Sequence, residues 1–173
     1  MNVLFDLLVK EPVRVSDLER MYGAYAGRPE FVDEVIRAFR QLDPDIAWRA
    51  AWLLRRHARI HGLQEHELMR LIQCADEQEH WIARLNLCQL FAATGCPARA
   101  RETLFPFLAD CFRDRRTIVR AWALSALMAF RAEEAYARVV AEMVRRARQD
   151  RAASMQARLR HLERMQRRAL ADA

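Results

Sequence analysis

The chain has 173 residues, of which 53% are hydrophobic and 30% charged, with a formal net charge of +6. This composition is typical of a folded globular domain and excludes an intrinsically disordered chain. Glycine and proline are scarce (four and five residues), which favours helices. We therefore expect a single domain over residues 1–173, long enough to bury roughly two-thirds of its unfolded surface.

Residues 1–27 are expected to form an additional helical segment at the N-terminus. Within it, Ser16 and Glu19 match the spacing of a capping box, which marks the start of a helix. The next helix is predicted over residues 31–42, because a proline directly before it suits the first turn of a helix.

The later helices also have clear boundary signals. The segment Asp43-Pro44-Asp45 supplies an N-cap for a helix over 46–61, which Gly62 ends, and Gly95 ends a helix over 81–94 in the same way. No stretch shows the alternation of a β-strand, so the predicted fold is all-α with short loops and antiparallel neighbours. The remaining helices are predicted over 63–76, 97–113, 116–130, 132–149 and 151–170.

One arginine recurs at a nearly constant interval along these helices. Arg49, Arg84, Arg120 and Arg158 are separated by 35, 36 and 38 residues. A turn with an acidic residue precedes each arginine, and another amphipathic helix precedes the turn. A period of this length with two helices per unit predicts an α-solenoid.

The stretch Val119–Leu127, V-R-x-x-A-x-x-A-L, resembles the second helix of a HEAT repeat. The resemblance covers about residues 29–170 and implies a right-handed α-solenoid of about four helical hairpins, with residues 1–27 as a cap. The expected repeats are 29–62, 63–95, 97–131 and 132–170. In HEAT proteins the recurring arginine commonly pairs with the turn aspartate of an adjacent unit, so the resemblance also implies a structural ladder. Its expected members are Arg49, Arg84, Arg120, Asp76 and Asp114.

The sequence contains no pattern of ordinary enzyme chemistry. Its three serines lack a glycine-rich elbow, and its four scattered glycines cannot form a phosphate-binding loop. We therefore expect a non-enzymatic protein without a cofactor or a small-molecule substrate. The leading hypothesis is a protein-binding scaffold or adaptor that holds a partner segment on the concave face of the solenoid. The candidate contact residues on this face are Arg55, Arg56, Gln89 and Arg131.

The second half of the chain is strongly basic. Residues 1–86 carry 12 basic and 14 acidic side chains, whereas residues 87–173 carry 17 and 9. Such asymmetry is typical of a polyanion-binding face, although a solvated terminal cap explains the same arginines. The alternative hypothesis is therefore a nucleic-acid-binding module. The candidate polyanion-binding residues are Arg145, Arg146, Arg148, Arg158, Arg160, Arg164, Arg167 and Arg168.

The tryptophans bear on this alternative. HEAT-like DNA glycosylases are similar in combining tryptophans, arginines and an aspartate on a concave face, but no local motif in this chain identifies such an aspartate. Trp48 and Trp52 share a helix face, and Trp81 and Trp122 occupy corresponding parts of later units. Together with Arg55, Arg56 and Arg59 they are candidates for an aromatic-basic groove, but core packing is the better explanation of tryptophans at this spacing.

The remaining candidate features predict no site. His57 and His61 lie one helical turn apart, but no H-E-x-x-H pattern supplies further metal ligands, so we expect no metal site. The four cysteines form no C-x-x-C pair and are expected to be reduced thiols of a cytoplasmic protein. The N-terminal stretch lacks the basic region of a signal peptide, and no uncharged run is long enough for a membrane span.

Overall fold

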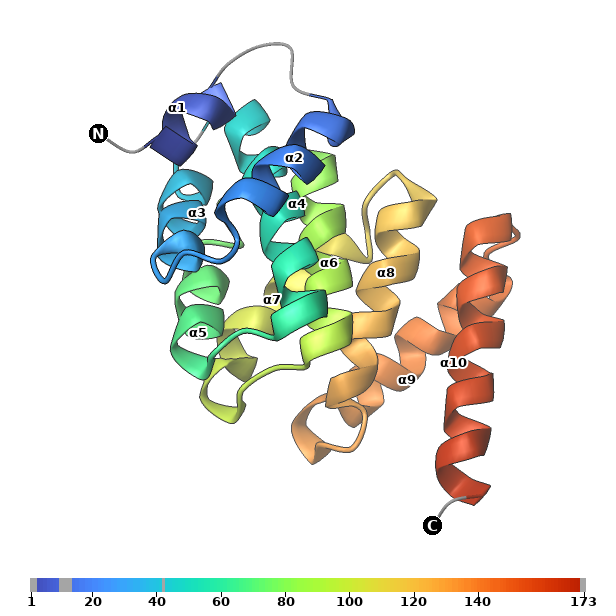
Figure 1. The fold of residues 1–173 in the computed structure, drawn as a ribbon. Helices are drawn as coiled ribbons and strands as arrows, with labels where there is room; N and C mark the ends of the chain where they lie inside the picture. The colour runs from blue at the N-terminus through green and yellow to red at the C-terminus, as the bar shows by residue number, and fades with distance from the viewer. Residues whose placement is uncertain (1–2, 10–13, 42, 172–173) are drawn as a thin grey trace.

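The computed structural model describes residues 3–9, 14–41 and 43–171 (Figure 1). Within these ranges the chain is all-helical, with ten α-helices, two short 3-10 segments and no β-strand. The α-helices are α1 (Val3–Val9), α2 (Val15–Tyr25), α3 (Phe31–Phe39), α4 (Pro44–His61), α5 (Glu65–Gln73), α6 (Trp81–Thr94), α7 (Arg101–Cys111), α8 (Thr117–Leu127), α9 (Glu134–Gln149) and α10 (Ala153–Ala171). The 3-10 segments are η1 (Ala98–Ala100) and η2 (Met128–Phe130).

The boundary residues of α4 and α6 confirm the predicted start and stop signals. An oxygen of the Asp43 side chain accepts hydrogen bonds from the backbone N–H groups of Asp45 (2.9 Å) and Ile46 (3.1 Å). Gly62 and Gly95 follow the two helices with φ angles of 78° and 76°. These positive φ values explain why glycine occupies both positions, since other residues rarely adopt them.

The start of α2 differs from the prediction. The helix begins at Val15 with Arg14 as its N-cap, so Ser16 lies inside the first turn. The carboxylate of Asp17 accepts the backbone N–H of Arg14 at 2.8 Å. Asp17 therefore supplies the acidic residue of the capping box that we had expected from Glu19.

Four helices pack side by side in chain order and form what we call the central row: α4, α6, α8 and α10 (Figure 1). The helix before each of them, namely α3, α5, α7 or α9, is called a flanking helix. α3 packs on α4, α7 on α8 and α9 on α10, and α5 lies between α3 and α7. The basic C-terminal helix α10 therefore packs against the body of the molecule through both α8 and α9.

Helix α8 is apolar around most of its circumference because it has neighbours on several sides. It packs on α6, α7, α9 and α10. Six of its eleven residues are buried, and three of these are alanines, which allow a close approach of neighbouring helices. Its apolar character is therefore a consequence of packing.

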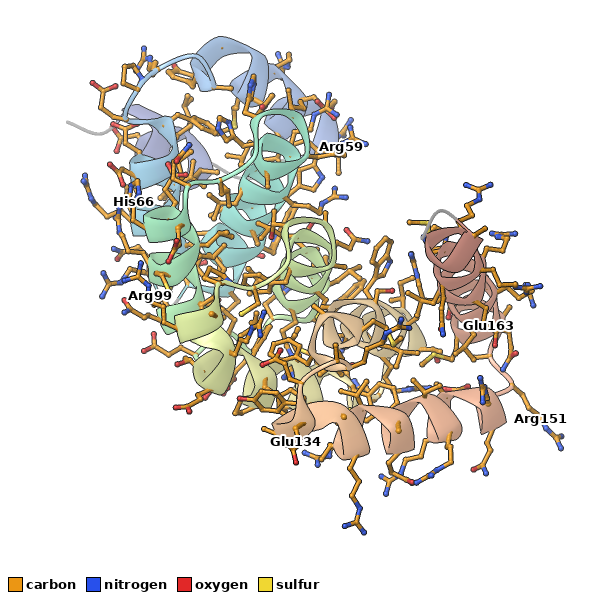
Figure 2. The ribbon with its side chains drawn as sticks, turned by 90° about the horizontal axis from the view of Figure 1, so that it is seen from below. Arg59, His66, Arg99, Glu134, Arg151 and Glu163 are labelled. Atoms are coloured by element: carbon orange, nitrogen blue, oxygen red, sulfur yellow. The ribbon has the colours of Figure 1, made fainter. Side chains whose placement is uncertain are left out.

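The flanking side of the molecule is joined by ion pairs between successive hairpins. Asp33 on α3 pairs with Arg70 on α5. Glu65 on α5 pairs with Arg99 at 2.6 Å, in the segment that leads into α7. Figure 2 shows Arg99 and His66 on the side of the molecule opposite to α10. Asp33 and Glu65 thus each pair with an arginine of the next hairpin along the chain.

Candidate functional site

A hollow of about 440 Å³ lies between α10 and the other three helices of the central row. We call it the basic groove. Figure 2 shows Arg59 on the edge of the helical body that faces α10. The groove is lined by Arg55, Ala58, Arg59, Gln89, Leu90, Ala92, Ala93, Trp122, Ser125, Arg158, His161, Leu162 and Met165.

Among the described residues, the lining of the basic groove contains three arginines and no carboxylate. In the described part of the chain, Arg55, Arg59 and Arg158 form no ion pair with any acidic side chain. What distinguishes this groove is that three such arginines line one hollow. Three arginines around one hollow, none of them in an ion pair among the described residues, create a positive potential that attracts anions.

Arg55 is the most constrained of these three arginines. Its Nε atom is buried and has no hydrogen-bond partner among the described residues. Burial lowers the pKa of its guanidinium, and the positive charges of Arg59 and Arg56 lower it further. A partly buried cation next to two others is electrostatically unfavourable, and a bound anion would relieve this repulsion.

Trp122 and Arg158 form a stacked pair across the groove, between α8 and α10. The Arg158 guanidinium carbon lies 3.4 Å from the centre of the Trp122 ring. Burial lowers the pKa of Arg158, and the ring's electron density partly stabilises the charge. Trp122 is half-buried, so its indole contributes to the groove surface as well as to the packing of α8 on α10.

Neutral groups complete the groove. Gln89 supplies an amide and Ser125 a hydroxyl, which also donates to the carbonyl oxygen of Ala121 at 3.4 Å. His161 is exposed on α10. Small and flexible apolar residues form the rest. The groove therefore combines cations, an aromatic face and neutral hydrogen-bonding groups.

The helices of the central row and the flanking helices differ in their numbers of charged side chains. The central row carries eleven arginines and only two carboxylates, Asp45 and Glu163. Both carboxylates are engaged: Asp45 accepts the indole N–H of Trp48 at 3.3 Å, and Glu163 lies 3.7 Å from Arg148 on α9. The flanking helices carry seven arginines and eight carboxylates. Positive charge is thus concentrated on the helices that line the groove.

The structure separates the four residues predicted for the concave face. Arg55 and Gln89 line the basic groove. Arg56 instead lies 3.3 Å from Glu19 and over the ring of Tyr22, so it is directed toward α2. Arg131 is exposed next to a different hollow beside α9. The prediction thus named two groove residues and two that lie outside it.

The predicted polyanion-binding arginines are also divided. Of these, only Arg158 lines the basic groove. The three candidate arginines on α9 form ion pairs with carboxylates: Arg145 and Arg146 pair with Glu142, and Arg148 pairs with Glu163. The last four are exposed along α10: Arg160, Arg164, Arg167 and Arg168.

The members of the predicted arginine ladder lie away from the basic groove. Arg120 donates to Asp150 at 2.7 Å, and Arg84 donates to Asp110 at 2.6 Å. The expected partner Asp114 binds elsewhere, because its side chain accepts the backbone N–H of Arg116 at 2.8 Å, just before α8. Arg84 pairs with Asp110 instead of Asp114. Asp110 lies about one helical turn before Asp114, on the last turn of α7.

Arg49, the first arginine of the predicted ladder, also has a partner other than the predicted one. Arg49 is buried and donates to the backbone carbonyl of Leu8 at 2.6 Å, which ties α1 to α4. Asp76, the turn acid expected here, is exposed. The N-terminal segment therefore supplies a hydrogen-bond acceptor that the repeat pattern did not predict.

Of the polar groove residues, Ser125 and His161 were not predicted as site residues from the sequence, whereas Arg59 was grouped with Arg55 in the candidate aromatic-basic groove. Arg59 carries the clearest signal, because it lies four residues after Arg55 and so shares a helix face with it. Ser125 and His161 have no such signal, since only the packing of α8 against α10 brings them to the same hollow.

The histidines do not form part of a metal site in the described ranges. No group of three or more histidine, cysteine or acidic side chains is placed to hold a metal ion in those parts of the chain. The rings of His57 and His61 lie 4.8 Å apart, and the Tyr22 hydroxyl is 3.5 Å from Nδ1 of His57. Among the helices described, none combines the length and apolar character that crossing a bilayer requires.

The four cysteines are free, and Cys74, Cys88 and Cys111 are buried. Burial raises the pKa of Cys74 and of the half-buried Cys96 to about 11, so neither thiol is activated as a nucleophile.

No protein-family model, curated protein or solved structure matches this chain.

Proposed function

We propose that this chain is a HEAT-like right-handed α-solenoid of about four hairpins that binds nucleic acid in its basic groove without altering it chemically. The solenoid assignment is supported by the recurring arginine and by the alternation of central-row and flanking helices. In this arrangement the basic groove belongs to the concave face. The free thiols suit a reducing compartment, and we propose that the protein acts in the cytoplasm.

The observation that carries the functional proposal is the set of three arginines that form no ion pair among the described residues, in a groove whose described lining has no carboxylate. Arginine is well suited to phosphate, because its planar guanidinium donates two parallel hydrogen bonds. Trp122 adds an aromatic face, which bases use for stacking. An acidic protein segment would satisfy the arginines equally well but would make no use of the indole.

The same groove argues against base excision. HEAT-like DNA glycosylases combine tryptophans and arginines with an aspartate, whereas no aspartate or glutamate of the described residues lines this groove. Without a carboxylate, the lining has no group to stabilise the positive charge that develops on a sugar when a base leaves. We therefore propose binding without glycosylase activity.

A protein partner is the second candidate, and a separate hollow favours it. This hollow of about 490 Å³ lies beside α9, and we call it the α9 hollow. Its surface is mostly apolar but has arginines at its edge, which is the composition of a small protein-binding patch. It is lined by Met128, Arg131, Ala132, Ala137, Val140, Ala141, Val144, Arg145, Arg148 and Gln166.

Fluorescence anisotropy with labelled DNA and RNA over a salt series tests the proposal. We expect binding that weakens linearly on a log–log plot, with a slope of about −0.7 to −0.9 per phosphate contact. The variant Arg55→Gln/Arg59→Gln should bind at least about tenfold more weakly at low salt and show a shallower slope.

The matched control is Arg37→Gln/Arg138→Gln, which removes the same charge from exposed positions on the flanking helices α3 and α9. It should keep nearly the wild-type affinity. No binding at about 50 mM salt would refute the nucleic-acid proposal and direct attention to the α9 hollow. Equal losses in both double variants would mean that overall charge, not the groove, is responsible.

A further inference from the structure

We propose that the basic groove is specific for single-stranded nucleic acid and that an unstacked base binds against the indole of Trp122. This inference rests on the proposed function and narrows its ligand class. It assigns Trp122 as the base-stacking residue, Arg158 as a mobile phosphate-binding residue, and Arg55 and Arg59 as fixed contacts to the strand. Its basis is the position of the one tryptophan that lines the groove.

Trp122 lies on α8, between α6 on one side and α10 on the other. Its indole is half-buried, and Arg158 of α10 covers one face of the ring at 3.4 Å. Arg55 and Arg59 come from α4, on the far side of α6. The aromatic face is therefore recessed within the groove, and the cations lie on both sides of it.

This placement selects against a duplex. In double-stranded nucleic acid the ring faces of the bases are stacked on one another, so an indole cannot reach them from outside. Phosphates, by contrast, are equally accessible in single and double strands. Only a strand with an unstacked base can fill the space next to Trp122 and reach the arginines with its backbone.

The lining around the indole suits a base better than a peptide carboxylate. Leu162 and Met165 of α10 and alanines of α4 and α6 supply apolar contacts, while Gln89 and Ser125 supply neutral donors and acceptors. A base has flat apolar faces and polar edges, which match this combination. Acidic side chains would place their charge against apolar carbon, which is unfavourable.

Arg158 has to move when a base binds on the face that it covers. Its guanidinium lies in van der Waals contact with the indole, so the two leave no room for a third ring between them. It has no carboxylate partner in the described chain, so only the cation–π contact and packing hold it there. A base can replace it on the indole, and the released guanidinium can then bind a neighbouring phosphate.

The test compares ligands that share a phosphate backbone but differ in their bases. Four probes of about twelve nucleotides are titrated by anisotropy: oligo(dT), oligo(U), a fully abasic single strand and a DNA hairpin duplex. We expect oligo(dT) or oligo(U) to bind at least about tenfold more tightly than the abasic strand and the duplex. The stronger of the two identifies DNA or RNA as the source of the strand.

Intrinsic fluorescence assigns the contact to Trp122. Binding of a base-containing strand should quench part of the emission, and Trp122→Phe should abolish this change while affinity stays within about threefold. Trp122→Leu should lose about tenfold or more in affinity for the base-containing strands and little for the abasic strand. Urea unfolding of both variants shows whether they are folded. The comparison of abasic with base-containing strands uses the wild-type protein and therefore does not depend on the folding of a variant.

The outcomes separate this inference from the proposed function. Equal binding of abasic and base-containing strands, or preference for the duplex, would overturn the single-strand inference and leave nucleic-acid binding in place. Failure to bind any of the four probes would remove both. Equally tight binding of poly-glutamate of matched charge would overturn both in favour of an acidic protein partner.

Discussion

Arg120 on α8 donates a hydrogen bond to Asp150, which lies between α9 and α10, with 2.7 Å between Nη2 and Oδ2. The same guanidinium donates to the backbone carbonyls of Asp114 (2.9 Å) and Arg115 (3.1 Å) in the turn before α8. Asp150 in turn accepts the backbone N–H of Ala152 at 3.0 Å. One arginine thereby joins two inter-helix turns, and the groove geometry depends on it because α10 forms one wall.

Replacing Arg120 with alanine should lower the free energy of unfolding by about 2 kcal/mol, because several acceptors and a carboxylate lose their partner in a site shielded from water. The side chains of Arg120 and Asp150 are only 23% and 21% exposed, so water replaces the lost bonds incompletely. Urea unfolding measures the difference. The control Arg115→Ala removes an exposed arginine of the same turn and should change stability by less than about 0.5 kcal/mol. Equal effects of both substitutions would show that Arg120 has no special structural role.

The stability supplied by Asp150 should depend on pH. Its pKa is lowered, chiefly by the hydrogen bond from Arg120 and then by the N–H of Ala152. A carboxyl group with a lowered folded-state pKa stabilises the fold at pH values above its unfolded-state pKa, near 4, and this contribution is lost as pH falls through the folded-state pKa.

The variant Asp150→Asn should therefore differ most from the wild type at neutral pH and progressively less in acid. Urea unfolding at about pH 7, 5 and 3 measures this, with little change expected between the first two values and a marked convergence at the third. A difference that stays constant down to pH 3 would mean that the charge of Asp150 does not contribute.

Much of the fold could be predicted from the sequence because its boundary signals are local. Asp43, Gly62 and Gly95 act through their own backbone or that of the next few residues, so the limits of α4 and α6 follow directly. Packing partners such as Leu8 for Arg49 could not be predicted, because the contact depends on how an N-terminal helix outside the repeat docks onto α4.

The candidate site was predicted only in part, for the same physical reason. Arg55 and Gln89 were named from their place on the second helices of the hairpins, and both line the groove. Arg56 was named with them, but it lies against a neighbouring carboxylate on α2 instead. Arg158 was grouped with other arginines of similar appearance, and only the stacking of α10 on Trp122 distinguishes it.

Two glycine substitutions should have opposite effects on stability. Gly62→Ala should cost about 1 kcal/mol, because its φ of 78° is unfavourable for any residue with a Cβ atom. Gly23→Ala should stabilise the protein by about 0.5–1 kcal/mol, because Gly23 lies inside α2 and a Cβ atom there meets nothing within 4 Å. Thermal unfolding of both variants beside the wild type checks the signs. A destabilising Gly23→Ala would contradict the helical geometry of this segment.

The repulsion between Arg55 and Arg59 should lower the stability of the protein. Neither arginine has an acidic partner in the described part of the chain, and the positive charge of Arg59 adds to burial in lowering the pKa of the Arg55 guanidinium. Arg59→Gln should therefore leave the free energy of unfolding unchanged or raise it by up to about 0.5 kcal/mol, while we expect it to weaken the proposed nucleic-acid binding.

Salt provides an independent check of this repulsion, because it screens exposed charges over about 10 Å at 0.1 M. Raising salt from about 20 to 200 mM should stabilise the wild type more than Arg59→Gln, since the variant has less repulsion to screen. Arg37→Gln, which removes an exposed arginine on α3, should respond to salt as the wild type does. If the Arg59 variant proved clearly less stable and kept the wild-type salt response, Arg59 would be a structural residue. The groove would then lose one of the charges on which its proposed function depends.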